Sequence, residues 1–324
     1  MQEANAQSGA DRDGLPARLK ALGPTYGAWA ALVLLIVVNA IFTKNFATAS
    51  NSWNILLQVT PTVLVAVGMT MVIATGGIDL SVGSVMAVAS AVAATLLDRG
   101  VGLAVLVALV TALAVGALNG ALISGFRIQA IIVTLALLIA GRGAAQVMSQ
   151  GGQLIPFSNP TFESLGTGHV GPIPVQVLVM GIVLGAALFV MRSTSFGRYV
   201  IAVGGNEAAA RIAGVKIHRT KIAVYAMSGA LAGLAGLIET ARLGASDAAK
   251  VGLNIELDAI AAVVIGGTPL TGGRATLSGT LAGALIMQVI TTSFNMQLIP
   301  FSWSLVLKAA IILVAVYVQR PKVA

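Results

Sequence analysis

Long apolar stretches separated by short polar ones fill most of this chain. A helix needs about 20 apolar residues to cross the hydrocarbon core of a membrane. The pattern predicts an all-α, polytopic membrane protein with about ten transmembrane helices. The candidate spans are Tyr26–Phe42, Trp53–Thr75, Leu80–Leu97, Val101–Ser124, Ile128–Ser149, Val175–Met191, Ile222–Ala241, Leu257–Ile265, Leu277–Ser293 and Trp303–Val318. The eighth is too short to span alone, so we expect a half-helix or a re-entrant segment there.

One basic segment, Arg192–Lys221, divides these spans into two groups. It carries six Lys and Arg residues and one acidic residue, Glu207. Short loops rich in Lys and Arg stay on the cytoplasmic side of a membrane. We therefore expect a cytoplasmic tail over residues 1–25, a first membrane half over 26–191, a cytoplasmic loop over 192–221, a second membrane half over 222–319 and a cytoplasmic tail over 320–324.

The other charged loops fit the same orientation. With the N-terminus inside and ten crossings, Phe126–Arg127 and the C-terminal Arg320 and Lys322 also fall inside. The loop Gln150–Pro174 falls outside, and it contains no Lys or Arg. The pattern therefore predicts a multi-pass membrane protein with both termini in the cytoplasm.

Composition supports a membrane protein and excludes several other classes. Hydrophobic residues make up 57% of the chain and charged residues 9%, whereas a soluble domain has about 25% charged residues. The net charge of +8 comes from residues that flank apolar spans, so we do not expect nucleic acid as a partner. With no cysteine and only two histidines, no metal site and no catalytic Ser/His/Asp set is expected.

The middle of the basic segment has the features of a short surface helix. Asn206 suits the N-cap, Glu207 suits the first turn, and Gly214 can end the helix. Ala208 and Ala209 favour helix between them. Such a helix between two membrane halves is a surface that another protein can hold, although Arg192, Lys216 and Lys221 could equally contact anionic lipid.

Two glycine-rich segments resemble each other. Gly76–Ser84 aligns with Gly266–Arg274 at four identical positions, and Ser81 aligns with Thr271. Transporters often carry repeats with broken helices at matching positions. The candidates for a broken-helix motif or a translocation pathway are therefore Gly76, Gly77, Asp79, Ser81, Gly266 and Gly267. Chance similarity is the alternative in a chain with 37 glycines.

Asp79 lies in the first of these segments, two residues before Ser81. A carboxylate at membrane depth is costly and often functional. The alternative is helix capping, in which Asp79 accepts hydrogen bonds from the next turn. Arg142 lies in an apolar stretch, and the sequence does not show its partner.

The small-residue pairs Gly229/Gly233 and Ala232/Gly236 allow close helix contact. They fit either packing within one subunit or a dimer face.

The sequence contains no G-x-x-x-x-G-K-[ST] phosphate-binding loop. We therefore expect a transport subunit rather than an enzyme, with no cofactor of its own. Most spans lack ionisable residues at their centres, which favours an external motor over an ion gradient. An ion-coupled secondary transporter of a small polar solute, and a passive channel, are the alternatives.

Three segments together resemble the permease subunits of ribose-type bacterial sugar ABC importers. They are Thr75–Ser84, Gly197–Gly214 and Glu256–Gly267, and the similarity extends over most of the chain from about Trp53. The region from Ala140 to Gly152 is similar to the galactofuranose branch. In this family two permease chains, identical or related, associate with two cytoplasmic ATPase chains and a periplasmic sugar-binding protein.

The resemblance implies those partners, with ATP and Mg²⁺ bound by the ATPase. It also implies that Gly204–Gly214 is the coupling helix, with Asn206, Glu207, Ala208, Ala209, Arg211 and Gly214 in contact with that ATPase. The predicted function is import of a monosaccharide by alternating access. The identity of the sugar is not predicted.

Overall fold

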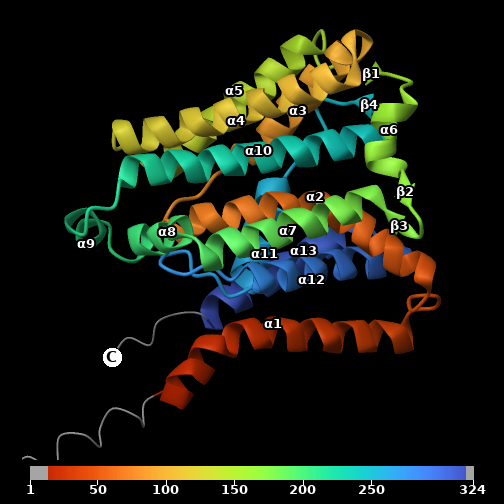
Figure 1. Ribbon diagram of the computed structural model, residues 1–324. Helices are drawn as coiled ribbons and strands as arrows, with labels where there is room; N and C mark the ends of the chain where they lie inside the picture. Colours follow the sequence, from red (N-terminus) through yellow and green to blue (C-terminus); the bar gives the residue numbers. More distant parts are fainter. Residues whose placement is uncertain (1–13, 319–324) are drawn as a thin grey trace, which may run out of the picture.

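The computed structural model describes residues 14–318, and most of them lie in helices (Figure 1). The main helices are α1 (Gly14–Phe42), α2 (Ala49–Ala74), α3 (Val82–Leu96), α4 (Val101–Gly125), α5 (Ala130–Met148), α7 (Val175–Ser193), α10 (Ile217–Leu243), α11 (Ile255–Ile265), α12 (Leu277–Met296) and α13 (Phe301–Val318). Short helices are η1 (Leu97–Arg99), α6 (Pro160–Thr167), α8 (Ser195–Gly205) and α9 (Glu207–Ile212). The all-helical fold is confirmed. The expected C-terminal cytoplasmic tail and residues 1–13 of the expected N-terminal tail lie outside the described residues.

Among the described residues, seven helices are long and apolar enough to cross a membrane, so the count of about ten is not confirmed. The seven contain the second to seventh expected spans and the ninth. The first and tenth correspond to the shorter apolar stretches Tyr26–Phe42 and Ser302–Val314. The eighth is α11, whose 11 residues extend over about 16 Å, half of a hydrocarbon core about 30 Å thick.

Two pairs of short strands complete the fold. β1 (Ile155–Pro156) pairs antiparallel with β4 (Ala245–Ser246), and β2 (His169–Val170) pairs antiparallel with β3 (Ile173–Pro174). The β1–β4 pair joins the end of α10 to the loop that follows α5. We call this end of the bundle the β4 end, and the opposite end, which carries α9, the α9 end (Figure 1).

The loops are distributed between the two ends of the bundle. The α4–α5 loop with Arg127 and the segment from α8 to the start of α10 meet at the α9 end, where both line one pocket. The loop after α5 lies at the β4 end through β1. After α10 reaches the β4 end, residues 244–254 and α11 together return the chain to the α9 end. The loop 244–254 and α11 therefore share the length of the bundle between them.

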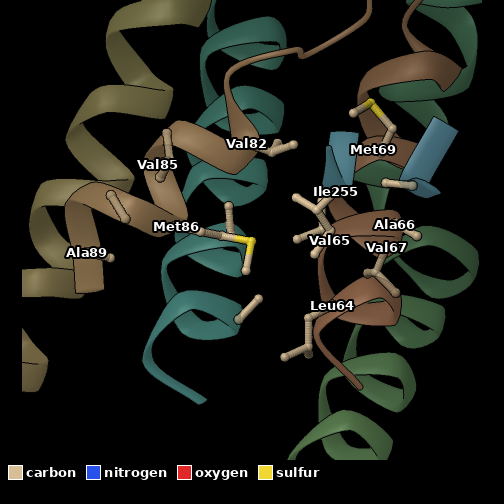
Figure 2. Close-up of a cluster of buried hydrophobic side chains, with 14 of the residues drawn as sticks. Leu64, Val65, Ala66, Val67, Met69, Val82, Val85, Met86, Ala89 and Ile255 are labelled. Carbon is tan, nitrogen blue, oxygen red and sulfur yellow. The ribbon is translucent and has the colours of Figure 1, made fainter. Parts of the chain in front are cut away.

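The core lies around α2, α3 and α10. Of the side chains in α2, those from Val63 to Ala74 are buried without exception. Figure 2 shows Met86 of α3 pointing toward Val65 of α2 and Ile255 of α11, with Val82 beside them. Because the second half of α2 is buried on every side and the helix packs against α10, α11 and α12, α2 is a central helix rather than a lipid-facing one.

Small residues bring α10 close to α3 and α4. A Cβ atom at Gly229 would overlap the carbonyl oxygen of Ala112 in α4, and one at Gly236 would lie 2.5 Å from the carbonyl oxygen of Met86 in α3. Gly233 packs on Ala112 as well. The small-residue pattern of α10 therefore packs helices within this subunit, as membrane helices with GxxxG spacing do.

The helices form two sets, α2–α5 and α10–α13, and the first helix of each set packs against the second and third helices of the other. α10 packs against α3 and α4, and α2 packs against α11 and α12. α2 ends at the α9 end, where α10 begins, so the sets α2–α5 and α10–α13 run in opposite directions. This is an inverted arrangement of the kind found in transporters. It relates the α2–α3 connection to the α10–α11 connection, and not to residues 266–274 as the sequence alignment suggested.

The two aligned glycine segments share a local turn, with a shift of one residue. Gly76 ends α2 with φ +79° and Gly267 ends α11 with φ +87°. In both turns the next residue donates its N–H back into the helix, from Gly77 to Val72 and from Thr268 to Val263. Gly76 therefore corresponds to Gly267 rather than to Gly266, because both are αL residues that end a helix.

Candidate functional site

The α2–α3 connection carries a buried polar network centred on Asp79, which is 1% exposed. Its Oδ1 accepts hydrogen bonds from the backbone N–H of Ser81 at 3.0 Å and from the Ser81 hydroxyl at 2.6 Å. Its Oδ2 accepts from the Ser228 hydroxyl of α10 at 3.0 Å. Asn119 of α4 donates to Ser81 Oγ at 2.8 Å.

The network around Asp79 therefore joins the start of α3 to α10 and, through Ser81, to α4. The capping interpretation is right in part, since the carboxylate accepts the N–H of the residue that precedes α3. The bond to Ser228 across 149 positions of sequence is not capping. Ser228 and Asn119 were not predicted, since a single polar residue in an apolar span shows no partner in the sequence.

The α10–α11 connection enters the bundle from the β4 end and meets the start of α3. A Cβ atom at Gly83 would overlap the carbonyl oxygen of Gly252, and a Cβ at Gly252 would lie 2.6 Å from the carbonyl oxygen of Gly83. Gly252 has φ +65°, which favours glycine. The two connections thus touch backbone to backbone inside the molecule.

Arg142 of α5 holds the second connection in place. Its guanidinium donates to the carbonyl oxygens of Ala248 at 2.9 Å and Val251 at 2.7 Å. A longer contact of 3.4 Å reaches the carbonyl of Gly252. Five donors in a planar fork allow this multiple binding. Arg142, which had no visible partner in the sequence, is a structural clamp on residues 248–252.

Replacing Arg142 with alanine should loosen this connection. Hydrogen bonds from a charged group contribute about 1.5–3 kcal/mol, so we expect the Tm of the detergent-solubilised protein to fall by about 5 °C. The exposed Arg99 at the same end provides the matched control, and Arg99→Ala should leave Tm unchanged. Equal Tm values for the two variants would show that Arg142 is not a clamp. Differential scanning fluorimetry measures the difference.

At the opposite end, α9 has the caps that the sequence indicated. Asn206 accepts the N–H of Ala209 at 2.9 Å, and Gly214 follows the helix with φ +81°. Glu207 binds both Lys221 at 2.7 Å and Arg211 at 3.2 Å. The hydrogen bond from Lys221, with the charges of both cations, lowers the pKa of the Glu207 carboxyl below its ordinary value. α9 is thereby tied to the start of α10.

One face of α9 is free in this subunit. Ala208, Ala209 and Arg211 are exposed, and Ile212 is 89% exposed. These exposed residues form the face of α9 that is not covered within this subunit. The sequence analysis did not single out Ile212.

Gly204, just before α9, lies against the end of α2 and the α11–α12 connection. A Cβ atom there would overlap the carbonyl oxygen of Ala74, the last residue of α2, and would lie 2.7 Å from the backbone nitrogen of Gly273. Gly273 donates its N–H to the same Ala74 carbonyl at 3.0 Å. The end of α8, which leads into the base of α9, therefore meets the end of α2 and the α11–α12 connection. We call this backbone contact the glycine junction (Ala74, Gly204, Gly273).

A pocket of about 810 Å³ opens beside this junction at the α9 end. Its lining includes Gly76 and Gly77 from the first glycine turn, together with Glu207, Arg211 and Lys221. Residues that the sequence assigned to two separate roles, coupling and pathway, thus face one space. Asp79 and Ser81 lie deeper in the bundle, and Gly266 packs against Gly279 of α12.

The comparisons with known proteins agree with this architecture. Residues 51–316 match the family model described as branched-chain amino acid transport system / permease component. The chain belongs to this permease family. The sequence-based assignment to this group of transport proteins is confirmed.

Several relatives of this permease are sugar importers. It is 42% identical to the ribose import permease protein RbsC of Escherichia coli K12 over 90% of this chain and 92% of that protein. It is 38% identical to the RbsC protein of Bacillus subtilis over 94% of both chains, and 37% identical to the galactofuranose transporter permease protein YtfT of Escherichia coli K12 over 90% of this chain and 88% of YtfT. No solved structure matches it. With seven apolar helices long enough to cross a membrane within residues 14–318, it is a multi-pass inner-membrane permease.

Proposed function

We propose that this permease is the membrane-spanning subunit of an ABC importer that moves a monosaccharide from the periplasm to the cytoplasm by alternating access. A separate ATPase chain powers the transport and binds ATP and Mg²⁺. A second permease chain, identical or related, completes the pathway, and a periplasmic binding protein delivers the sugar. The relatives named above support the substrate class, since their names specify ribose and galactofuranose.

The glycine junction is the observation that carries this mechanism. A motor shifts a conformational equilibrium only if it interacts differently with the two states. Gly204 leaves no space between the base of α9 and the backbones of Ala74 and Gly273. A displacement of α9 by an ATPase must therefore move the end of α2 and the α11–α12 connection, which belong to opposite sets of the inverted arrangement.

The proposed orientation places the α9 end in the cytoplasm. Arg127, Arg192, Arg198, Arg211, Lys216, Arg219, Lys221 and Arg274 lie in the loops and helix ends on this side. Their excess over acidic residues fits the positive-inside rule. The exposed face of α9, with Ile212, is then available to the ATPase.

Reversing either charge of the Glu207–Arg211 pair should uncouple transport. Glu207→Lys places a third cation beside Lys221 and Arg211, and Arg211→Glu places two carboxylates together. Both changes loosen α9 from α10 and alter its exposed face. In proteoliposomes that contain the permease, its ATPase and the binding protein, we expect ATP hydrolysis to persist while uptake of radiolabelled sugar falls to near background.

Arg192→Glu is the matched control, because Arg192 is exposed at the same end outside α9. It should leave uptake unchanged. Normal uptake in both α9 variants would contradict the coupling role. Uptake by the permease alone, without ATPase or nucleotide, would contradict the ABC mechanism and favour a passive channel or the alternative of an ion-coupled secondary transporter.

A further inference from the structure

The pocket at the α9 end is lined by more basic than acidic side chains. Four of its lining side chains are basic, Arg127, Arg211, His218 and Lys221, and the acidic member of its lining is Glu207. Glu207 already binds Arg211 and Lys221. In the described part of the chain, no ion pair joins Arg127 to a carboxylate, and Arg127 is exposed.

Two helix N-termini open into the same pocket. α5 begins after Gln129 and α10 begins after Lys216, and neither helix has a side chain that caps its first N–H groups. Gln129, Ala130, Ile217 and His218, from these two starts, line the pocket. Free N–H groups and the positive end of the helix dipole favour an anion at each start.

A buried hydroxyl at the pocket wall lacks a partner. Tyr225 lines the pocket and is 1% exposed. Its hydroxyl has no hydrogen-bond partner among the described residues. It lies against Gly77, where a Cβ atom would overlap it. A buried polar atom without a partner is costly, so this wall of the pocket holds an unused hydrogen-bonding group.

We propose that this pocket binds a phosphate group. Donors approach it from α4–α5, from α9 and from α10, which suits the several oxygens of a phosphate better than the two of a carboxylate. The volume of about 810 Å³ is larger than inorganic phosphate requires, so the group belongs to a larger molecule. Phe126 and Ile128, on either side of Arg127, are 74% and 40% exposed. This apolar rim fits the glycerol and acyl chains of an anionic phospholipid, whereas a soluble phosphate ester would share only the headgroup contacts.

The experiment uses the purified permease alone, so its outcome does not depend on the proposed transport function. One arm measures binding of dioleoylphosphatidylglycerol by native mass spectrometry, with dioleoylglycerol as the phosphate-free control. The other arm measures binding of radiolabelled glycerol 3-phosphate by equilibrium dialysis, with glycerol as control. We expect the phosphate-bearing probe to bind in at least one arm and its phosphate-free control to fail.

Variants assign that binding to the pocket. Arg127→Ala should weaken it about tenfold, since a charge-assisted hydrogen bond is lost. Glu207→Gln should strengthen it, because the carboxylate that competes for Lys221 and Arg211 is removed. Arg198→Ala is the matched control, since Arg198 is an exposed arginine at the same end that does not line the pocket, and it should have no effect.

The two arms separate the sources of the phosphate. Binding of phosphatidylglycerol alone identifies a lipid headgroup site, and binding of glycerol 3-phosphate as well identifies a site open to soluble esters. Failure of both probes, or equal binding by wild type and Arg127→Ala, would overturn the proposal.

Discussion

Gly204→Ala should nearly abolish sugar uptake while Gly205→Ala leaves it intact. A Cβ atom at Gly204 would overlap the carbonyl oxygen of Ala74, whereas the nearest atom to a Cβ at Gly205 is Gly273 Cα at 3.9 Å, an ordinary contact. Both glycines lie in the last turn of α8, so helix propensity affects the two variants similarly. The difference between them isolates the glycine junction.

The expected loss of uptake in Gly204→Ala depends on which conformational state bears the overpacking strain. Overpacking costs about 1–3 kcal/mol, and backbone atoms cannot move aside as a flexible side chain can. If this strain falls on one of two access states, their balance changes by about 5- to 150-fold. The measurement is ATP-driven uptake in proteoliposomes, normalised to the amount of folded permease. Full uptake by Gly204→Ala with normal Tm would show that α9 moves independently of α2.

Asp79→Ala should be the most destabilising change in the α2–α3 connection. The Ser81 N–H, the Ser81 hydroxyl and the Ser228 hydroxyl would all lose their acceptor. Buried donors without partners cost about 1–3 kcal/mol each, so we expect a loss of about 3 kcal/mol and a fall in Tm of about 6 °C. Asp98→Ala, at an exposed position in η1, is the matched control and should leave Tm unchanged.

Asp79→Asn separates a structural role from an ion relay. The amide oxygen can still accept from Ser81, and the amide nitrogen can donate to the Ser228 oxygen, so the fold should persist. The ABC mechanism predicts uptake close to that of wild type, because no proton or ion passes through the carboxylate. A folded Asp79→Asn protein without uptake would favour the ion-coupled carrier.

Several features could be derived from the sequence because they depend on neighbouring residues. The caps of α9 at Asn206 and Gly214 are local, since each involves bonds within one turn. The apolar pattern located the helices for the same reason. At the eighth segment the pattern predicted a half-helix or a re-entrant segment, and α11 is a helix of only 11 residues. The part that residues 244–254 play beside it was not predicted, because that loop has no apolar periodicity.

The repeat that the sequence alignment suggested relates different segments from those that the packing relates. Two glycine turns at one end of the bundle look alike because both end a helix with an αL glycine, and this local requirement produced the alignment of Gly76 with Gly266. Packing relates other segments, the α2–α3 and α10–α11 connections, which share little sequence. Their contact at Gly83 and Gly252 joins positions far apart in the chain.

By itself, the sequence determined that this is a helical membrane permease and where its basic surface helix lies, since apolar length, loop charge and capping are properties of consecutive residues. Tertiary structure alone decided which residues Asp79 and Arg142 bind, and that Gly204 at the end of α8 meets the end of α2 and the α11–α12 connection. Those contacts depend on how helices from distant parts of the chain approach one another, and small residues allow that approach at many positions without indicating which partner will occupy the space.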